Sequence, residues 1–184
     1  MRRSGGGFLL GYHGCDAAVA EQLLDGVPFE FSRNPYDWLG WGAYFWENDP
    51  ERGLAWAKML MGARKNPVKT PAVVGAVIDP GFCLDLTTQA SLKVIKTAYD
   101  VAKQLAEGRG ETLVENTDDL RRERDCAVLN MLYETMPEPK FQTARSIFTE
   151  GGPLYDGAKM MSQTHVQIAV RDLTCIKGVF RVDL

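Results

Sequence analysis

Clustered metal-binding residues are missing from this sequence. Its 184 residues include only two histidines and four cysteines, and no two cysteines form a CxxC pair. Structural zinc and iron–sulfur sites need such ligands close together, so we expect neither of these sites and no other metal centre. The four cysteines are expected to be free thiols in a reducing compartment.

Long apolar segments are missing as well. The apolar run near the N-terminus, Phe8–Leu10, is far shorter than the core of a signal peptide. No stretch approaches the roughly 20 apolar residues that span a membrane. These two absences predict a cytoplasmic protein without a membrane partner.

An excess of one charge is missing too. Lysine and arginine number 21 against 24 acids, which gives a net charge of −3. This balance excludes a general nucleic-acid-binding surface, although it permits a local basic patch. The candidates for such a patch are Arg2, Arg3, Lys58, Arg64, Lys65 and Lys69.

The elements that the sequence does contain predict one α+β domain over residues 1–184. Asp16 precedes an expected helix over 17–24, and Asp49 precedes a helix that starts at Pro50, as N-cap residues do. Helical spacing predicts two further helices, which form an insertion at about 86–138. The expected strands are 8–13, 72–78, 144–148, 158–161, 164–170 and 175–182, and the helices of the insertion are 88–107 and 118–136.

Two patterns are candidates for chemistry. His13 ends the first expected strand and precedes Gly14, where a ligand can approach the backbone closely. All four tryptophans fall in one short segment around the run Gly-Trp-Gly-Ala-Tyr-Phe at 40–45. Aromatic clusters are usually core, but Tyr44 beside two glycines can also stack on a flat cationic ring such as oxidised nicotinamide. Trp56 would then form the second wall.

These segments resemble the ADP-ribosyltransferase superfamily, in the branch that contains diphtheria toxin and the poly(ADP-ribose) polymerases. The resemblance lies in Tyr-His-Gly-Cys at 12–15, in Asp-Trp-Leu-Gly-Trp-Gly-Ala-Tyr-Phe at 37–45 and in Ala-Trp-Ala at 55–57. It implies a split β-sandwich that takes NAD as its co-substrate.

The resemblance also implies a role for each matching residue. His13 would bind the adenine-side ribose, the backbone of Gly14 would bind the nicotinamide carboxamide, and Tyr44 would stack on the nicotinamide ring. Trp56, one residue beyond the usual position of the second aromatic residue, would cover the other side of that ring. Ser32 on the intervening loop is a candidate contact for ribose or phosphate.

The third motif of this branch is a glutamate at the start of a late strand, and the chain departs from it. The matching segment, 163–168, contains no acid. Gln167 is our choice for the equivalent residue, with His165 on the same face as the alternative. The preceding loop offers Glu150 or Asp156 as a replacement acid, unless both belong to an exposed turn.

Together these features predict a mono-ADP-ribosyltransferase that moves ADP-ribose from NAD to a macromolecular acceptor, either a protein or a nucleic acid. Arg145 would contact the pyrophosphate or lie at the surface. Bacterial members of this branch are often toxins, effectors or defence proteins, so an antitoxin or immunity protein is an expected partner. Because glutamine brings no charge, two alternatives stay open: an inactive NAD- or ADP-ribose-binding module, and an NAD glycohydrolase.

Overall fold

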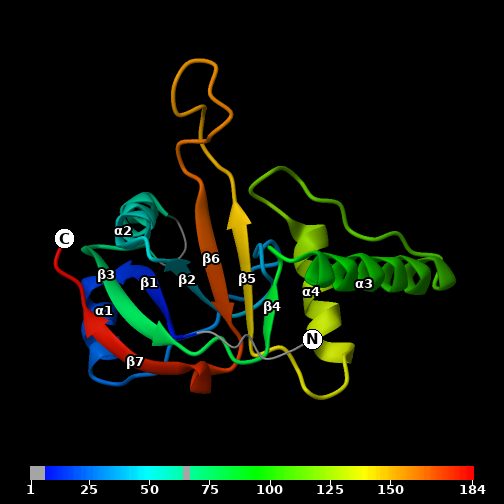
Figure 1. The fold of residues 1–184 in the computed structure, drawn as a ribbon, viewed down its shortest axis with the longest axis horizontal. Helices are drawn as coiled ribbons and strands as arrows, with labels where there is room; N and C mark the ends of the chain where they lie inside the picture. Colours follow the sequence, from blue (N-terminus) through cyan, green and yellow to red (C-terminus); the bar gives the residue numbers. More distant parts are fainter. Residues whose placement is uncertain (1–6, 64–66) are drawn as a thin grey trace.

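The computed structural model describes residues 7–63 and 67–184, which form an α+β domain as the sequence predicts (Figure 1). The strands are β1 (Leu9–Asp16), β2 (Ala43–Glu47), β3 (Pro71–Ile78), β4 (Cys83–Asp85), β5 (Thr143–Phe148), β6 (His165–Val170) and β7 (Ile176–Arg181). The α-helices are α1 (Ala17–Leu24), α2 (Pro50–Met59), α3 (Gln89–Gly108) and α4 (Glu123–Thr135). Short 3₁₀ turns cover Leu60–Gly62 and Leu173–Cys175.

The strands belong to one sheet in the order β4-β5-β6-β2-β1-β3-β7. Neighbours are antiparallel except β4 and β5, which run parallel. The contact between β1 and β2 is the narrowest, since it pairs only Gly11 with Glu47 and Tyr12 with Trp46. By contrast, β1 pairs with β3 over its whole length. We call the short contact between β1 and β2 the β1–β2 seam. It joins one half of the sheet, β4-β5-β6-β2, to the other half, β1-β3-β7.

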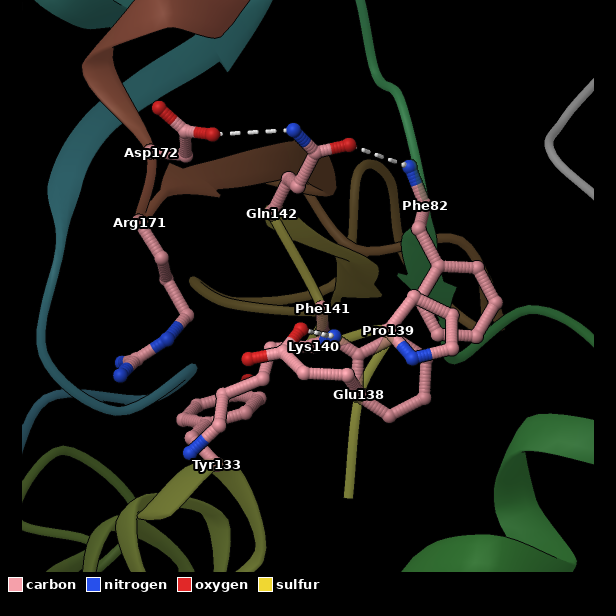
Figure 2. Close-up of a pocket in the computed structure, with 9 residues that line it drawn as sticks. All are labelled: Phe82, Tyr133, Glu138, Pro139, Lys140, Phe141, Gln142, Arg171 and Asp172. Atoms are coloured by element: carbon pink, nitrogen blue, oxygen red, sulfur yellow. Dashed lines mark hydrogen bonds between the residues drawn. The ribbon is translucent and has the colours of Figure 1, made fainter. Parts of the chain in front are cut away.

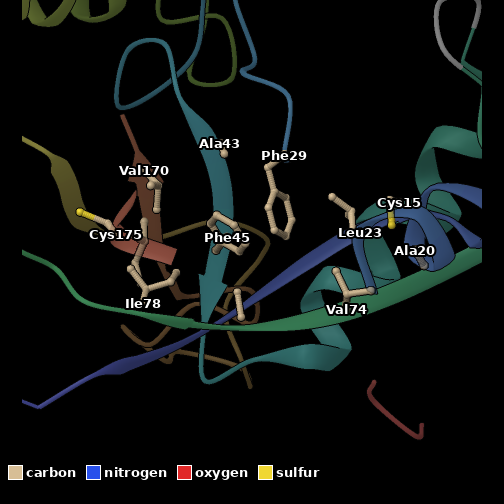
Figure 3. Packing of buried hydrophobic residues seen from close by; sticks show 12 residues of the cluster. Cys15, Ala20, Leu23, Phe29, Ala43, Phe45, Val74, Ile78, Val170 and Cys175 are labelled. Atoms are coloured by element: carbon tan, nitrogen blue, oxygen red, sulfur yellow. The ribbon is translucent and has the colours of Figure 1, made fainter. Parts of the chain in front are cut away.

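One face of the sheet packs against α1. Strand alternation places Ile168 and Val170 of β6 on this face, as the sequence predicts. Phe45 of β2 lies beside them, and Phe29, from the loop after α1, packs against it with ring centroids 4.9 Å apart (Figure 3). Leu23 of α1 is buried in the same cluster. The apolar area removed from water here holds α1 on the sheet, at about 25 cal/mol per Å².

The opposite face packs against α4, one of the two helices of the expected insertion. Leu129 and Tyr133 of α4 are buried together with Leu39, which precedes β2. The side-chain oxygen of Asn130 accepts a hydrogen bond of 2.9 Å from the backbone N–H of Trp41. Helix α4 is thus part of the central core, whereas α3 extends away from the sheet (Figure 1).

The helix starts show which local signals were correct. Asp16 and Asp49 cap α1 and α2 through their side chains, as predicted. The helix expected from Asp118 begins instead at Glu123. The reason is that the Asp118 carboxylate accepts hydrogen bonds from the backbone N–H groups of residues 120–121 and so forms a turn.

The connection between β5 and β6 also differs from the expectation. Residues 158–161 do not form a strand, and only an isolated bridge joins Pro153 to Met161. The segment belongs instead to a long loop that projects beyond the sheet (Figure 1). Its glycines and proline favour turns over a regular strand.

Candidate functional site

Neighbouring strands carry the predicted site residues. Strand β1 holds His13 and Gly14, β2 holds Tyr44, and β6 holds Gln167. These strands are adjacent in the sheet in the order β1-β2-β6. The fold therefore places side by side the motifs that the sequence singled out.

The β1–β2 seam ends directly before His13 and Gly14. The backbone N–H of Asn48 donates to the carbonyl of Leu10 at 2.9 Å, so alternate residues of β1 point their backbone groups at β2. Gly14 is one of these residues. The regular pairing stops at Tyr12, and Gly14 does not form the next pair with β2. Its backbone groups thus point into the place where the two strands separate.

The His13 side chain bridges this separation. Its Nδ1 lies 2.9 Å from the carbonyl oxygen of Tyr44. Because a carbonyl only accepts, Nδ1 carries the proton, and Nε2 of the neutral ring is an acceptor. The ring packs between Phe29 and Phe45, with centroid distances of 5.4 and 5.8 Å. Burial lowers the pKa of His13, against the opposing effect of the bond to Tyr44, so the ring is neutral at pH 7.

The Tyr44 side chain lies on the other face of the sheet, in the cluster that contains α4. Its hydroxyl donates to the carbonyl of Gly40 at 2.7 Å and accepts from the N–H of Leu39 at 2.8 Å. Burial, with the nearby Asp37 carboxylate, raises the pKa of Tyr44 well above its ordinary value. The phenol therefore stays protonated, and it fixes the turn before β2. His13 and Tyr44 are bonded to each other, but their rings do not share one face.

We expect Tyr44→Phe to lower the free energy of unfolding by about 1–3 kcal/mol, because it leaves the buried backbone groups of Leu39 and Gly40 unpaired. Urea denaturation measures the change. Tyr155→Phe is the matched control, since Tyr155 is 60% exposed in the β5–β6 loop and its loss should change stability by less than about 0.5 kcal/mol. Equal stabilities for the two variants would contradict a structural role for the Tyr44 hydroxyl.

Trp46 is the aromatic residue that occupies the same face of β2 as Tyr44. Its indole is only 5% exposed and contacts Trp56 of α2, with ring centroids 5.8 Å apart. Trp56 itself is 36% exposed. Among the described residues the ring of Trp56 contacts Trp46, and no ring contact joins Trp56 to Tyr44.

The late strand places both candidates for the third motif on one face. Gln167 lies opposite Trp46 in the neighbouring strand. His165, two residues earlier, has a fully buried side chain, and its Nδ1 lies 2.8 Å from the carbonyl of Gln163. Burial lowers the pKa of His165, so this ring is also neutral with Nε2 as an acceptor.

Glu150 brings an acid to the start of the acid-free strand β6. Its Oε2 lies 2.8 Å from Nη2 of Arg52 in α2 and 3.6 Å from Nδ1 of His165. The side chains of this ion pair are only 18% and 16% exposed. Glu150 is therefore not part of an exposed turn. Asp156, the other candidate acid, does lie in the exposed part of the loop.

Three buried polar atoms around Glu150 have no hydrogen-bond partner among the described residues. They are Nε1 of Trp46, Nε of Arg52 and Nε2 of His165. The guanidinium carbon of Arg52 lies 5.9 Å from the Trp46 ring centre, so these residues are contiguous. Leaving a buried polar group unpaired costs about 1–3 kcal/mol, and such groups commonly face a ligand or water. We call Trp46, Arg52, Glu150 and His165 the polar cluster.

The remaining candidates have other partners. The Ser32 hydroxyl accepts from the side chain of Asn34 at 2.9 Å, at the start of the loop to β2. Arg145 is not a free surface residue, because it pairs with Glu47 at 2.5 Å and with Asp85 at 3.4 Å. The expected basic patch falls partly outside the described residues, at Arg2, Arg3, Arg64 and Lys65.

Sequence reasoning missed Arg52 and Arg122. Arg52 lies in the first turn of α2, where an arginine is typical of a solvated surface. Arg122 lies just before α4, and its guanidinium carbon is 4.1 Å from the centre of the Trp38 ring, which in turn stacks near His165 at 6.2 Å. Trp38 thus lies between the insertion and the polar cluster, an arrangement that no local pattern indicates.

Comparisons with family models, with curated proteins and with solved structures found no match to this chain. Within residues 7–63 and 67–184, no three His, Cys, Asp or Glu side chains are grouped to hold a metal ion. No helix in the described part of the chain is both long and apolar enough to cross a membrane.

Proposed function

We propose that this chain is an NAD-dependent mono-ADP-ribosyltransferase with a variant of the ADP-ribosyltransferase fold. The observation that carries the proposal is the separation of β1 from β2 at Gly14, with the His13 imidazole bonded across to Tyr44. The Gly14 backbone lies at this separation, with the His13 imidazole on the face that packs against α1 and the Tyr44 and Trp46 rings on the opposite face. The polar cluster lies next to it, across Trp46.

The groups at this separation suit the nicotinamide half of NAD. A carboxamide has one donor side and one acceptor side, which the N–H and C=O of Gly14 can pair. A cationic ring is favoured by aromatic faces, which Tyr44 and Trp46 supply. Beyond the nicotinamide half, Nε2 of His13 would accept a hydrogen bond from a hydroxyl of the adenine-side ribose. NAD supplies the ADP-ribosyl group and its leaving nicotinamide.

The polar cluster would carry the transfer. The bond between the ribose and nicotinamide breaks with its electron pair going to the nicotinamide, and the acceptor nucleophile bonds to the same ribose carbon and loses a proton. Glu150 is the acid positioned to take this proton, and its charge would favour an oxocarbenium-like transition state. Gln167 would orient the ribose through its amide. Glu150 thus favours an enzyme over a binding module.

Incubation of the full chain with NAD labelled in the adenylate part and with cell extract tests the proposal. We expect both nicotinamide release and a labelled macromolecule, which protease and nuclease digestion would identify as protein or nucleic acid. Nicotinamide release without a labelled acceptor would indicate that the chain is an NAD glycohydrolase and not a transferase. NAD binding by calorimetry without either product would leave a binding module, and no binding at all would reject the site.

We expect Gln167→Glu to raise the rate of nicotinamide release about tenfold or more, because it places a charge where glutamine has none. Nicotinamide release in the absence of an acceptor is the measurement. Gln163→Glu is the matched control, since Gln163 is exposed before the start of β6. If both variants release nicotinamide at the same rate, Gln167 does not face the ribose.

A further inference from the structure

A cavity of about 760 Å³ lies at the end of β6 opposite to His165. Figure 2 shows its walls, which come from the C-terminal end of α4, the segment before β5, the turn after β6 and Phe82 just before β4. None of the residues proposed to bind NAD lines it. Its volume is in the range of pockets that take small organic ligands.

Arg171 is the charged group that distinguishes this cavity. Its guanidinium carbon lies 3.8 Å from the centre of the Tyr133 ring, and its Nη1 donates to the carbonyl of Trp41 at 2.5 Å. No acid among the described residues forms an ion pair with it. Burial lowers the pKa of Arg171, which is the signature of a cation with reduced hydration. Its Nε and Nη2 keep a two-donor edge for a carboxylate or phosphate.

Two acids line the same cavity, but both have other partners. Asp172 accepts from the backbone N–H and the hydroxyl of Thr174 at 3.0 and 2.6 Å. One oxygen of Glu138 accepts from the backbone N–H of Lys140 at 3.0 Å. The Lys140 ammonium donates to the carbonyl of Glu134 and adds a second cation, which has no carboxylate partner in the described part of the chain. None of these contacts joins Arg171 to a carboxylate, so the anionic group of a ligand can pair with it.

Aromatic rings form the rest of the wall. Phe82 and Phe141 stack with centroids 4.7 Å apart and planes 11° from parallel, and Tyr133 lies under Arg171. We propose that this cavity binds a planar organic anion, an aromatic carboxylate or phosphate. Its charged group would pair with Arg171, and its ring would pack on the aromatic wall. This site is separate from the proposed NAD site and does not depend on it.

Calorimetric titration of the full chain with sodium benzoate and with phenyl phosphate tests the site. We expect a dissociation constant of the order of 1 mM for at least one of them, as suits ligands of this size. Proton spectra should show shifts of the ring signals of Phe82 and Tyr133. The tighter probe identifies the anion as carboxylate or phosphate, and benzyl alcohol, which has the ring without the charge, should bind about tenfold more weakly or not at all.

Arg171→Gln should weaken binding of the better probe about tenfold or more. Arg181→Gln is the matched control, since Arg181 is an exposed arginine paired with Glu21. Because Arg171 also contacts Tyr133, thermal unfolding must show that the variant is folded. Lys140→Gln changes an exposed side chain and should weaken binding about threefold, which keeps the test valid if Arg171→Gln does not fold. Undetectable binding of both anions to the unmodified chain would overturn the proposal, as would equal binding of benzyl alcohol.

Discussion

Glu150→Gln is expected to lower the rate of ADP-ribose transfer about a hundredfold or more. Glutamine keeps the size of the side chain, but it can neither take the proton of the acceptor nor bring a negative charge to the ribose. The affinity for NAD should change much less, because Glu150 is not among the groups proposed to hold the nicotinamide. Label transfer gives the rate, and calorimetry gives the affinity.

Two further variants distinguish a catalytic role of Glu150 from a structural role in its ion pair with Arg52. Arg52→Gln removes the partner of Glu150 but keeps the carboxylate, so we expect a smaller loss of rate than for Glu150→Gln. Glu21→Gln breaks the exposed pair with Arg181 and should leave the rate unchanged. Equal losses in Glu150→Gln and Arg52→Gln would mean that the ion pair only supports the fold, and the assignment of Glu150 as the acid would then fail.

Gly14→Ala is expected to destabilise the protein by about 3 kcal/mol or more, at the upper end for an overpacked site. A Cβ atom at Gly14 would lie 1.9 Å from the backbone oxygen of Gly53 and 3.3 Å from the backbone nitrogen of Ala57. Both atoms belong to α2, so the helix must move away from β1. Urea denaturation measures the loss of stability.

Gly178→Ala is the matched control for this change. Gly178 also lies in a strand, β7, but no atom of residues 7–63 or 67–184, apart from its immediate neighbours, lies within 4 Å of the position of an added Cβ. We expect its stability to stay within about 0.5 kcal/mol of the original protein. A similarly small change for Gly14→Ala would show that α2 does not rest on Gly14.

Local sequence signals predicted the elements that depend on local interactions. Asp16 and Asp49 cap their helices because an N-cap needs only the first turn that follows it. Strand β4 was not predicted, since Cys83–Asp85 is too short for a periodic pattern and depends on parallel pairing with β5. Such a strand forms because it pairs with residues far away in the sequence, and a short stretch of sequence does not show that pairing.

In the candidate site, too, local motifs were predicted from the sequence, whereas contacts between distant residues were not. The motifs at His13 and Tyr44 were recognisable from the sequence, but the hydrogen bond between them exists only because β1 and β2 are neighbours. The Arg52–Glu150 pair joins residues 98 positions apart, and neither residue has a local pattern that names the other. The assignment of α4 to the core likewise needed the contacts of Leu129 with residues near β2.

The β1–β2 seam has a mechanical consequence. Rotation of one half of the sheet against the other would disturb the pairs at Gly11 and Tyr12 and the hydrogen bonds from His13 to Tyr44 and from Asn48 to Leu10. The longer β1–β3 and β2–β6 ladders would move as units. Such domain-like bending belongs to the microsecond-to-millisecond range. Helix α2 rests on β1, yet Arg52 reaches Glu150 beside β6, so this ion pair links the two halves. The carboxylate that we assign to the chemistry thus also links the two halves of the sheet, and a ligand that drew it away from Arg52 would remove one of the contacts that hold them together.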